Sequence, residues 1–223
     1  MSDGTRTRGR LDHNQELYQL SYAHRARLNL APRGTRWTGA RHATMGRVSF
    51  ALGDTAPSFS LPDTDGVEYA LPTDPAPPAT VVVVTCNHCP YVIAWNPRLR
   101  AVADDYTVRG VRFLAVNAND AKRYPADSPA AMARFVREQS WPIPYLHDES
   151  QEVARALDAQ VTPHVFVLDA EHRLRYRGAP DADHTDESQR AQWLRSALDA
   201  LLAGEDPGPA DTSPRGCSVK WKS

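Results

Sequence analysis

The chain has few cysteines and no long apolar run. Only three cysteines occur in 223 residues, too few for the disulfide framework of a small secreted domain, and the odd number leaves one unpaired. No stretch approaches the roughly 18–20 apolar residues of a membrane span. The first residues also lack the apolar core of an export signal. We therefore expect a soluble, cytoplasmic protein rather than a secreted scaffold or a membrane protein.

The net charge is small as well, at −1, but it is unevenly distributed. Residues 1–48 contain nine arginines and no lysine against three acidic residues, and the rest of the chain is acidic. Such a basic arm can bind nucleic acid or an acidic partner. We expect instead a disordered, solvated extension and no nucleic-acid partner. A natural start of the protein at Met45 would also account for the arm.

The remaining length suits one domain with a C-terminal extension. Short apolar strands alternate with amphipathic helices and end in a strand pair and a final helix, which is typical of an α/β fold. We predict a three-layer α/β/α sandwich around a central mixed β-sheet over residues 49–203. Residues 204–223 are predicted to form a proline-rich linker and a tail that carries Cys217 and Trp221.

Local signals predict several element boundaries. Asp65-Gly66 predicts the turn of a β-hairpin. Ser128 followed by Pro129 predicts the N-cap and first position of a helix. Asn96-Pro97 should kink or end the helix that contains it, and the last helix is expected over 186–203 with Gly204 as its stop.

The strongest functional signal is a C-x-x-C pair, Cys86 and Cys89. The four valines Val81–Val84 before it indicate a buried strand, and Pro90 directly after it suits the first turn of a helix. A thiol at a helix N-terminus meets unsatisfied N–H groups and the positive end of the helix dipole, and both favour the reactive thiolate. The pair therefore predicts chemistry in which disulfides are made and broken.

Two other interpretations of the pair stay open, metal binding and inert packing in the core. A structural zinc site needs four ligands, usually as two separated pairs, and Cys217 is the only further cysteine, which argues against zinc. Copper binding by Cys86, Cys89 and a histidine is harder to exclude, because thiolates select Cu(I). Two inert core residues would gain nothing from a strand-to-helix junction. We expect redox chemistry with no metal and no organic cofactor.

With Thr162-Pro163 at the head of a later strand, the chain resembles the thioredoxin superfamily. Within it, the sequence is similar to the peroxiredoxin-like branch that is grouped with redoxin and AhpC/TSA proteins. The motifs that carry this resemblance are Thr85-Cys-Asn-His-Cys-Pro-Tyr91, Asn117-Ala-Asn-Asp-Ala121, Tyr124-Pro-Ala-Asp-Ser-Pro129, Pro144-Tyr-Leu-His-Asp-Glu149, Thr162-Pro163, Tyr176-Arg-Gly178 and Gly216-Cys-Ser-Val-Lys-Trp221. The resemblance implies a thioredoxin-like fold in which a cis Thr162–Pro163 bond faces the cysteines and docks an extended substrate.

The sequence departs from its relatives at the expected active site. Thr85 stands where thioredoxin has tryptophan, and Thr80 stands where thioredoxin has a buried acid. The peroxiredoxin pattern P-x-x-x-T-x-x-C is absent, since Val83 and Ala79 occupy its threonine and proline positions before Cys86. The resemblance is therefore more specific for the fold than for the reaction.

For the reaction we expect Cys86 to be an exposed nucleophile and Cys89 to resolve the mixed disulfide. His88 lies between them, and its imidazole could stabilise the Cys86 thiolate and make the pair more oxidising. A C-x-H-C arrangement resembles that of the DsbA family of disulfide oxidants. A surface histidine with no effect is the alternative.

Cys217 is the remaining thiol. It could return to Cys86 as a possible extra redox thiol, because a coil of about a dozen residues can span the distance. The interpretation we favour is a docked structural tail with an inert thiol, anchored by Trp221, because Val219 and Trp221 offer apolar surface to bury.

We predict a thiol–disulfide oxidoreductase that acts on thiol or disulfide proteins and is reduced by a cellular dithiol. A peroxidase that forms a Cys86 sulfenic acid is the first alternative. A copper or zinc module is the second.

Overall fold

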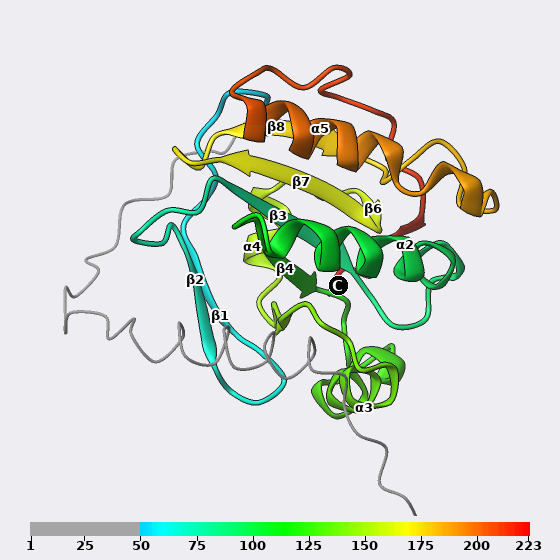
Figure 1. Cartoon of the computed structure of the whole chain (residues 1–223). Coiled ribbons are helices and arrows are strands. Elements are labelled where there is room, and N and C mark those ends of the chain that lie inside the picture. Colours follow the sequence, from blue (N-terminus) through cyan, green and yellow to red (C-terminus); the bar gives the residue numbers. More distant parts are fainter. Residues whose placement is uncertain (1–49) are drawn as a thin grey trace, which may run out of the picture. The chain divides into compact units, whose positions relative to one another are not determined.

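The computed structural model describes residues 50–223, and the prediction for residues 1–48 lies outside them. A five-stranded mixed sheet forms the centre of the domain, in the order β5-β4-β3-β7-β8 (Figure 1). β3 runs parallel to β4, and β4 runs parallel to β5, whereas β7 is antiparallel to both β3 and β8. The strands are β3 (Ala79–Thr85), β4 (Arg112–Asn117), β5 (Tyr145–His147), β7 (His164–Asp169) and β8 (Leu174–Gly178).

The remaining elements surround this sheet. Within residues 50–223, a β-hairpin and a two-residue strand pair lie beside it, and four α-helices and two short 3₁₀ turns connect the strands. These elements are β1 (Phe59–Pro62), β2 (Glu68–Leu71), β6 (Val161–Thr162), β9 (Cys217–Ser218), α2 (Pro90–Thr107), α3 (Pro129–Gln139), α4 (Glu152–Ala156), α5 (Gln192–Ala203), η1 (Pro125–Asp127) and η2 (Glu187–Gln189). None of the helices within residues 50–223 has the length and hydropathy that crossing a membrane requires.

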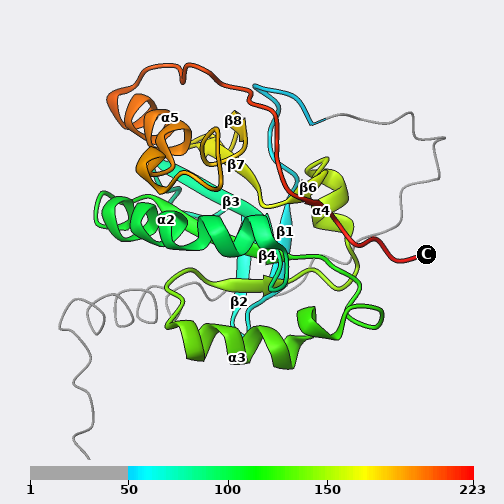
Figure 2. The ribbon, with the colours of Figure 1, turned by 90° about the vertical axis from the view of Figure 1, so that its right-hand side faces the viewer.

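The valines of β3 are buried on both faces of the sheet, as expected for a central strand. Because side chains alternate along a strand, Val81 and Val83 join one core with α2, α3 and α5. Val82 and Val84 join a second core with α4, the β1–β2 hairpin and the tail. Figure 2 shows α2 and α5 on one side of the sheet and α4 on the other. The predicted three-layer α/β sandwich is confirmed.

α2 spans Pro90–Thr107 and continues through Pro97, so that Asn96-Pro97 does not end it. One predicted helix boundary is wrong. The last helix begins six residues late, because Arg190 and Ala191 adopt left-handed conformations with φ of 51° and 56° and separate η2 from α5. The buried Asp181 carboxylate accepts the Ala191 N–H at 2.9 Å and thereby satisfies an amide at the start of α5. Ser128 caps α3 as predicted, accepting the Ala131 N–H at 3.3 Å.

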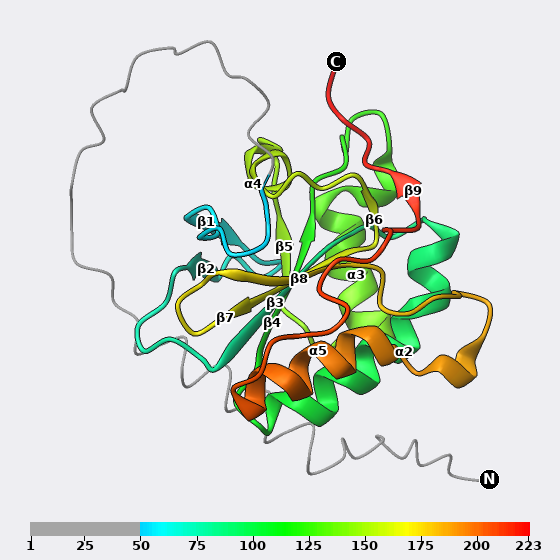
Figure 3. The ribbon, with the colours of Figure 1, turned by 90° about the horizontal axis from the view of Figure 1, so that it is seen from above.

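The C-terminal tail is docked on the domain. β9 pairs antiparallel with β6, and Figure 3 shows the two strands side by side. Val219 is only 3% exposed and lies in the second core, against which Trp221 packs. The expectation of a docked tail is confirmed, and the tail approaches the two residues before Pro163.

Candidate active site

Cys86 and Cys89 lie at the strand-to-helix junction that the sequence predicts. Cys86 follows the last residue of β3, and Cys89 is the N-cap residue of α2 with Pro90 at the first helical position. Neither thiol is accessible: Cys86 is 2% exposed and Cys89 is fully buried. The expectation that Cys86 is an exposed nucleophile is therefore wrong for this conformation. All three cysteines carry free thiols.

The peptide bond between Thr162 and Pro163 is cis, as the resemblance implied. Thr162 contacts both thiols of the pair. Its Oγ1 lies 3.4 Å from Cys86 Sγ, and its carbonyl oxygen accepts a hydrogen bond from the Cys89 thiol at 3.1 Å. The loop before Pro163 thus brings a hydroxyl and a carbonyl directly onto the two sulfurs.

The third cysteine belongs to the same cluster. Cys217 packs against the buried group formed by Cys86, Cys89 and Val92. It lies opposite Thr162 in the β6–β9 pair. Its thiol and its backbone N–H lie close enough to the Cys89 sulfur to lower the pKa of Cys89. The fold therefore brings together three thiols that are up to 131 positions apart in the sequence.

The contacts favour a negative charge on Cys89 over one on Cys86. A hydrogen bond from the Cys86 thiol lowers the pKa of Cys89 to about 4, with further hydrogen bonds from Cys217 and from the Val92 N–H. The same bond raises the pKa of Cys86 well above its usual range, and burial and the Asp127 carboxylate raise it further. Burial, followed by the interaction with Cys89, raises the pKa of Cys217 to about 11. In this closed conformation burial and these contacts disfavour the Cys86 thiolate.

Asp127 is the functional residue that sequence reasoning missed. Its side chain is completely buried in the last position of η1, close to Cys86. It accepts the Asn87 N–H at 2.7 Å, the Asn119 amide at 2.7 Å and the Asn117 amide at 3.3 Å. The motifs around Asn87, Asn117 and Asp127 were each recognised in the sequence, but nothing there shows that they meet.

His88 faces Asp127. Its Nδ1 lies 2.8 Å from Asp127 Oδ2, and its ring stacks on Tyr124 with centroids 5.8 Å apart. One ligand atom from each of Cys86, His88 and Asp127 lies within 4.8 Å of the other two. A thiol, an imidazole and a carboxylate at these distances could hold a divalent cation, or could act as nucleophile, base and orienting group.

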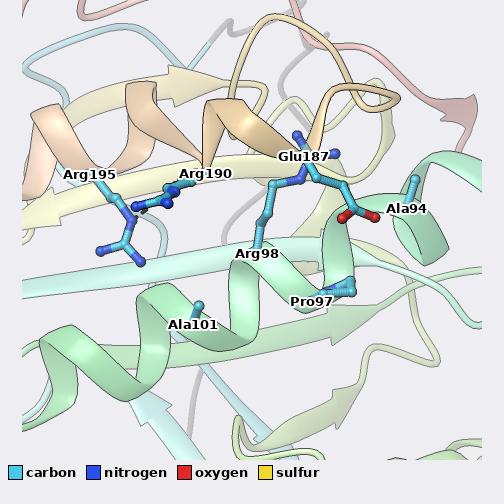
Figure 4. Close-up of a pocket in the computed structure, with 7 residues that line it drawn as sticks. All are labelled: Ala94, Pro97, Arg98, Ala101, Glu187, Arg190 and Arg195. Atoms are coloured by element: carbon cyan, nitrogen blue, oxygen red, sulfur yellow. Dashed lines mark hydrogen bonds between the residues drawn. The ribbon is translucent and has the colours of Figure 1, made fainter.

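A separate cavity of about 350 Å³ lies along α2, away from the thiols. It is lined by Ala94, Pro97, Arg98, Ala101, Glu187, Arg190 and Arg195 (Figure 4). Arg98 forms part of its wall, but its guanidinium already has structural partners. It pairs with the buried Asp181 at 2.7 Å and donates to three backbone carbonyl groups within residues 183–186. No cysteine lines this cavity, and we do not assign the chemistry to it.

Residues 52–177 match the model of the AhpC/TSA family. Two solved structures are similar over most of the chain. An uncharacterized conserved protein from Geobacillus kaustophilus is 40% identical, with a TM-score of 0.74, covering 78% of this chain and 94% of that one. A hypothetical protein from Sinorhizobium meliloti 1021 is 36% identical, also with a TM-score of 0.74, covering 78% and 97%.

A more distant structure shares the fold alone. Peroxidoxin BcpB from Mycobacterium tuberculosis is 18% identical with a TM-score of 0.51, covering 69% of this chain and 96% of that one. No curated protein matches the chain. The family match and the fold agree with the predicted redoxin branch of the thioredoxin superfamily.

Proposed function

The chain belongs to the AhpC/TSA family, and we propose that it is a thiol–disulfide oxidoreductase that uses Cys86 and Cys89 as its redox couple. One observation carries the proposal: two thiols at a strand-to-helix junction both contact the residue before a cis-proline. Thr162 Oγ1 is 3.4 Å from Cys86 Sγ, and Thr162 O is 3.1 Å from Cys89 Sγ. A backbone edge beside two sulfurs suits an extended chain that presents a disulfide. The expected partners are thiol or disulfide proteins and a cellular dithiol, in the cytoplasm.

In the proposed mechanism Cys86 attacks and Cys89 resolves. His88 accepts the Cys86 proton, and the buried Asp127 carboxylate lies beside the resulting imidazolium, 2.8 Å from His88 Nδ1. The Cys86 thiolate attacks a substrate disulfide and releases one substrate thiolate. Cys89 then attacks Cys86 Sγ, closing the Cys86–Cys89 disulfide and releasing the second. His88 thus acts as a base beside a nucleophile whose pKa its surroundings raise.

A second candidate, a thiol peroxidase, rests on a different observation. Cys86 is only 2% exposed, so a small peroxide can reach it more easily than a protein disulfide can. The threonine of the peroxiredoxin pattern is absent from the sequence before Cys86, but the Thr162 hydroxyl lies 3.4 Å from its sulfur. That hydroxyl could position a peroxide, after which Cys89 would condense with the Cys86 sulfenic acid.

Stopped-flow fluorescence of the reduced protein tests both candidates. Trp95 is buried on the helix that carries Cys89, and we expect its emission to respond to oxidation. The protein is mixed in separate runs with a protein disulfide and with hydrogen peroxide. A fast change with the protein disulfide supports exchange, and a fast change with peroxide alone replaces it with peroxidase activity.

Three variants assign the roles. Cys86→Ser should abolish either reaction, and Cys89→Ser should trap a mixed disulfide on Cys86 that a mass spectrum detects. Thr162→Val keeps the shape of the side chain but removes the hydroxyl. It should slow a peroxide reaction by roughly tenfold or more, as expected for loss of one transition-state hydrogen bond, and slow protein disulfide exchange less. Reaction of Cys86→Ser at the wild-type rate would refute both candidates.

A further inference from the structure

The backbone edge before Pro163 is already occupied by the protein's own tail. β9 pairs antiparallel with β6, so that Cys217 lies opposite Thr162 and Ser218 opposite Val161. Gly216 makes this approach possible. A Cβ atom on Gly216 would lie 2.1 Å from the Thr162 carbonyl oxygen, a distance that backbone atoms cannot accommodate without moving. An incoming extended chain would need the same edge.

The tail is held in one register on the C-terminal side of Cys217. The Lys220 N–H donates to Asn119 Oδ1 at 2.8 Å, and the Lys220 carbonyl accepts the Asp120 N–H at 2.8 Å. The Lys222 N–H donates to Gln151 Oε1, also at 2.8 Å. With Val219 buried, these bonds hold the position of Cys217 relative to the cysteine pair.

The Cys217 side chain is directed at one sulfur of the pair. Cys217 packs against the buried group that contains Cys86 and Cys89, and it lies close enough to the Cys89 sulfur for the two thiols to interact. Strand pairing opposite Thr162 is the backbone position expected of a bound substrate strand, and the contact with Cys89 places the Cys217 thiol beside the resolving cysteine. The tail therefore combines the backbone position of a substrate with a thiol at the place where exchange would occur.

We propose that the tail is the site's own substrate strand and that Cys217 is a third redox thiol, which exchanges with the Cys86–Cys89 disulfide to form a Cys89–Cys217 disulfide. This inference rests on the proposed function. The Cys217 thiolate attacks Cys89 Sγ, the new S–S bond forms as the Cys86–Cys89 bond breaks, and Cys86 leaves as a thiolate that takes up the proton lost by Cys217. The step is an isomerisation with no net oxidation.

The two disulfides give the site two closed arrangements. With Cys89 bonded to Cys217, the tail is covalently fixed over the substrate edge and Cys86 is regenerated as a thiol. Oxidation of Cys89 also removes two of the three causes that raise the pKa of Cys217, its hydrogen bond and its charge interaction with Cys89, and leaves only burial. Attack by Cys217 therefore becomes easier in the oxidised protein. Reduction of this bond, or its exchange with an external thiol, would release the tail.

Disulfide mapping in single variants tests the inference. Cys86→Ser is oxidised with glutathione disulfide, which supplies the oxidising equivalent, and its peptides are mapped by mass spectrometry. We expect a Cys89–Cys217 disulfide, formed through a Cys89–glutathione intermediate. Cys89→Ser is the matched control and should form far less of a Cys86–Cys217 disulfide. Glutathionylated Cys89 without an intramolecular bond would overturn the inference.

Two glycine variants test the role of strand pairing without touching a thiol. In the Cys86→Ser background, Gly216→Ala should displace the tail and slow closure of the Cys89–Cys217 bond by about tenfold or more, since positioning accounts for much larger rate factors. Gly208→Ala is the control, because a Cβ there meets nothing within 4 Å. Equal closure rates in the two variants would show that the docked strand does not position Cys217.

The same experiments separate this inference from the function on which it rests. The wild-type protein, oxidised in the same way, should contain the Cys86–Cys89 disulfide alongside the Cys89–Cys217 disulfide. Absence of the Cys86–Cys89 disulfide, together with no exchange in stopped flow, would refute the proposed function. Presence of the Cys86–Cys89 disulfide, with no Cys89–Cys217 bond in Cys86→Ser, would refute only the role of Cys217.

Discussion

The carboxylate of Asp127 offers the most direct test of how the site controls Cys86. Asp127→Asn removes a negative charge whose oxygen lies within 4.8 Å of Cys86 Sγ. That charge raises the pKa of Cys86, after the hydrogen bond with Cys89 and burial. The substitution should therefore lower the pKa of Cys86 and increase the thiolate fraction at neutral pH.

The size of the shift follows from the distance. Two unit charges at this separation interact by about 3.5 kcal/mol at an effective dielectric constant of about 20, which corresponds to about 2.5 pKa units. His88 and the amide donors around Asp127 offset part of the charge. We therefore expect the pKa of Cys86 to fall by about one to two units.

The assay needs a protein in which Cys86 is the sole thiol. The chain has three cysteines, so Cys89→Ser combined with Cys217→Ser provides that background. The pKa of Cys86 is then the midpoint of the pH dependence of its alkylation by iodoacetamide, with and without Asp127→Asn. Urea unfolding measures the accompanying loss of stability, which should be about 2–4 kcal/mol because buried donors lose their acceptor.

Asp120→Asn is the matched control. Asp120 is another buried aspartate of the same region, where it accepts the Lys122 N–H at 3.1 Å, but it is not among the groups that shift Cys86. It should leave the alkylation midpoint unchanged. If Asp127→Asn leaves the midpoint unchanged or raises it, the reasoning about Cys86 is wrong.

Two further predictions concern stability. His164 is 2% exposed, and burial is the main cause that lowers its pKa to about 4. The imidazole of the unfolded chain titrates near 6.5, so the neutral buried ring contributes to stability above about pH 6.5. About 3 kcal/mol of the free energy of unfolding is lost as the pH falls to about 4. Urea unfolding across that pH range should show this loss. His164→Asn retains an acceptor for the Gln160 N–H and should flatten the dependence of stability on pH. An equally steep dependence in the variant would exclude His164 as the cause. Ser128→Ala removes the cap of α3 and should cost about 1 kcal/mol, a fall of roughly 2–4 °C in the thermal midpoint. An unchanged midpoint in calorimetry would show that the cap contributes nothing.

The sequence was sufficient for features that depend on neighbouring residues. Val81–Val84 predicts a buried strand because four β-branched apolar residues cannot be solvated favourably, and Pro90 predicts a helix start because it lacks an N–H that the first turn does not use. The cysteine pair therefore had a predictable place. Ser128 was predictable for the same local reason. The cis bond before Pro163 was implied by the resemblance rather than by its neighbours.

The tertiary structure alone decided which distant groups surround the sulfurs. Asp127 is an ordinary acid in the sequence. It affects the pKa of Cys86 because η1 places its carboxylate in a buried position, where it accepts hydrogen bonds from the Asn87 N–H and the Asn119 amide. Cys217 could equally have belonged to a free tail. Its contact with Cys89 depends on strand pairing with Thr162, which a pattern of residues does not specify when the strand is two residues long. Burial and long-range pairing are properties of the packed chain, and so the charge and accessibility of the thiols were settled only by the fold.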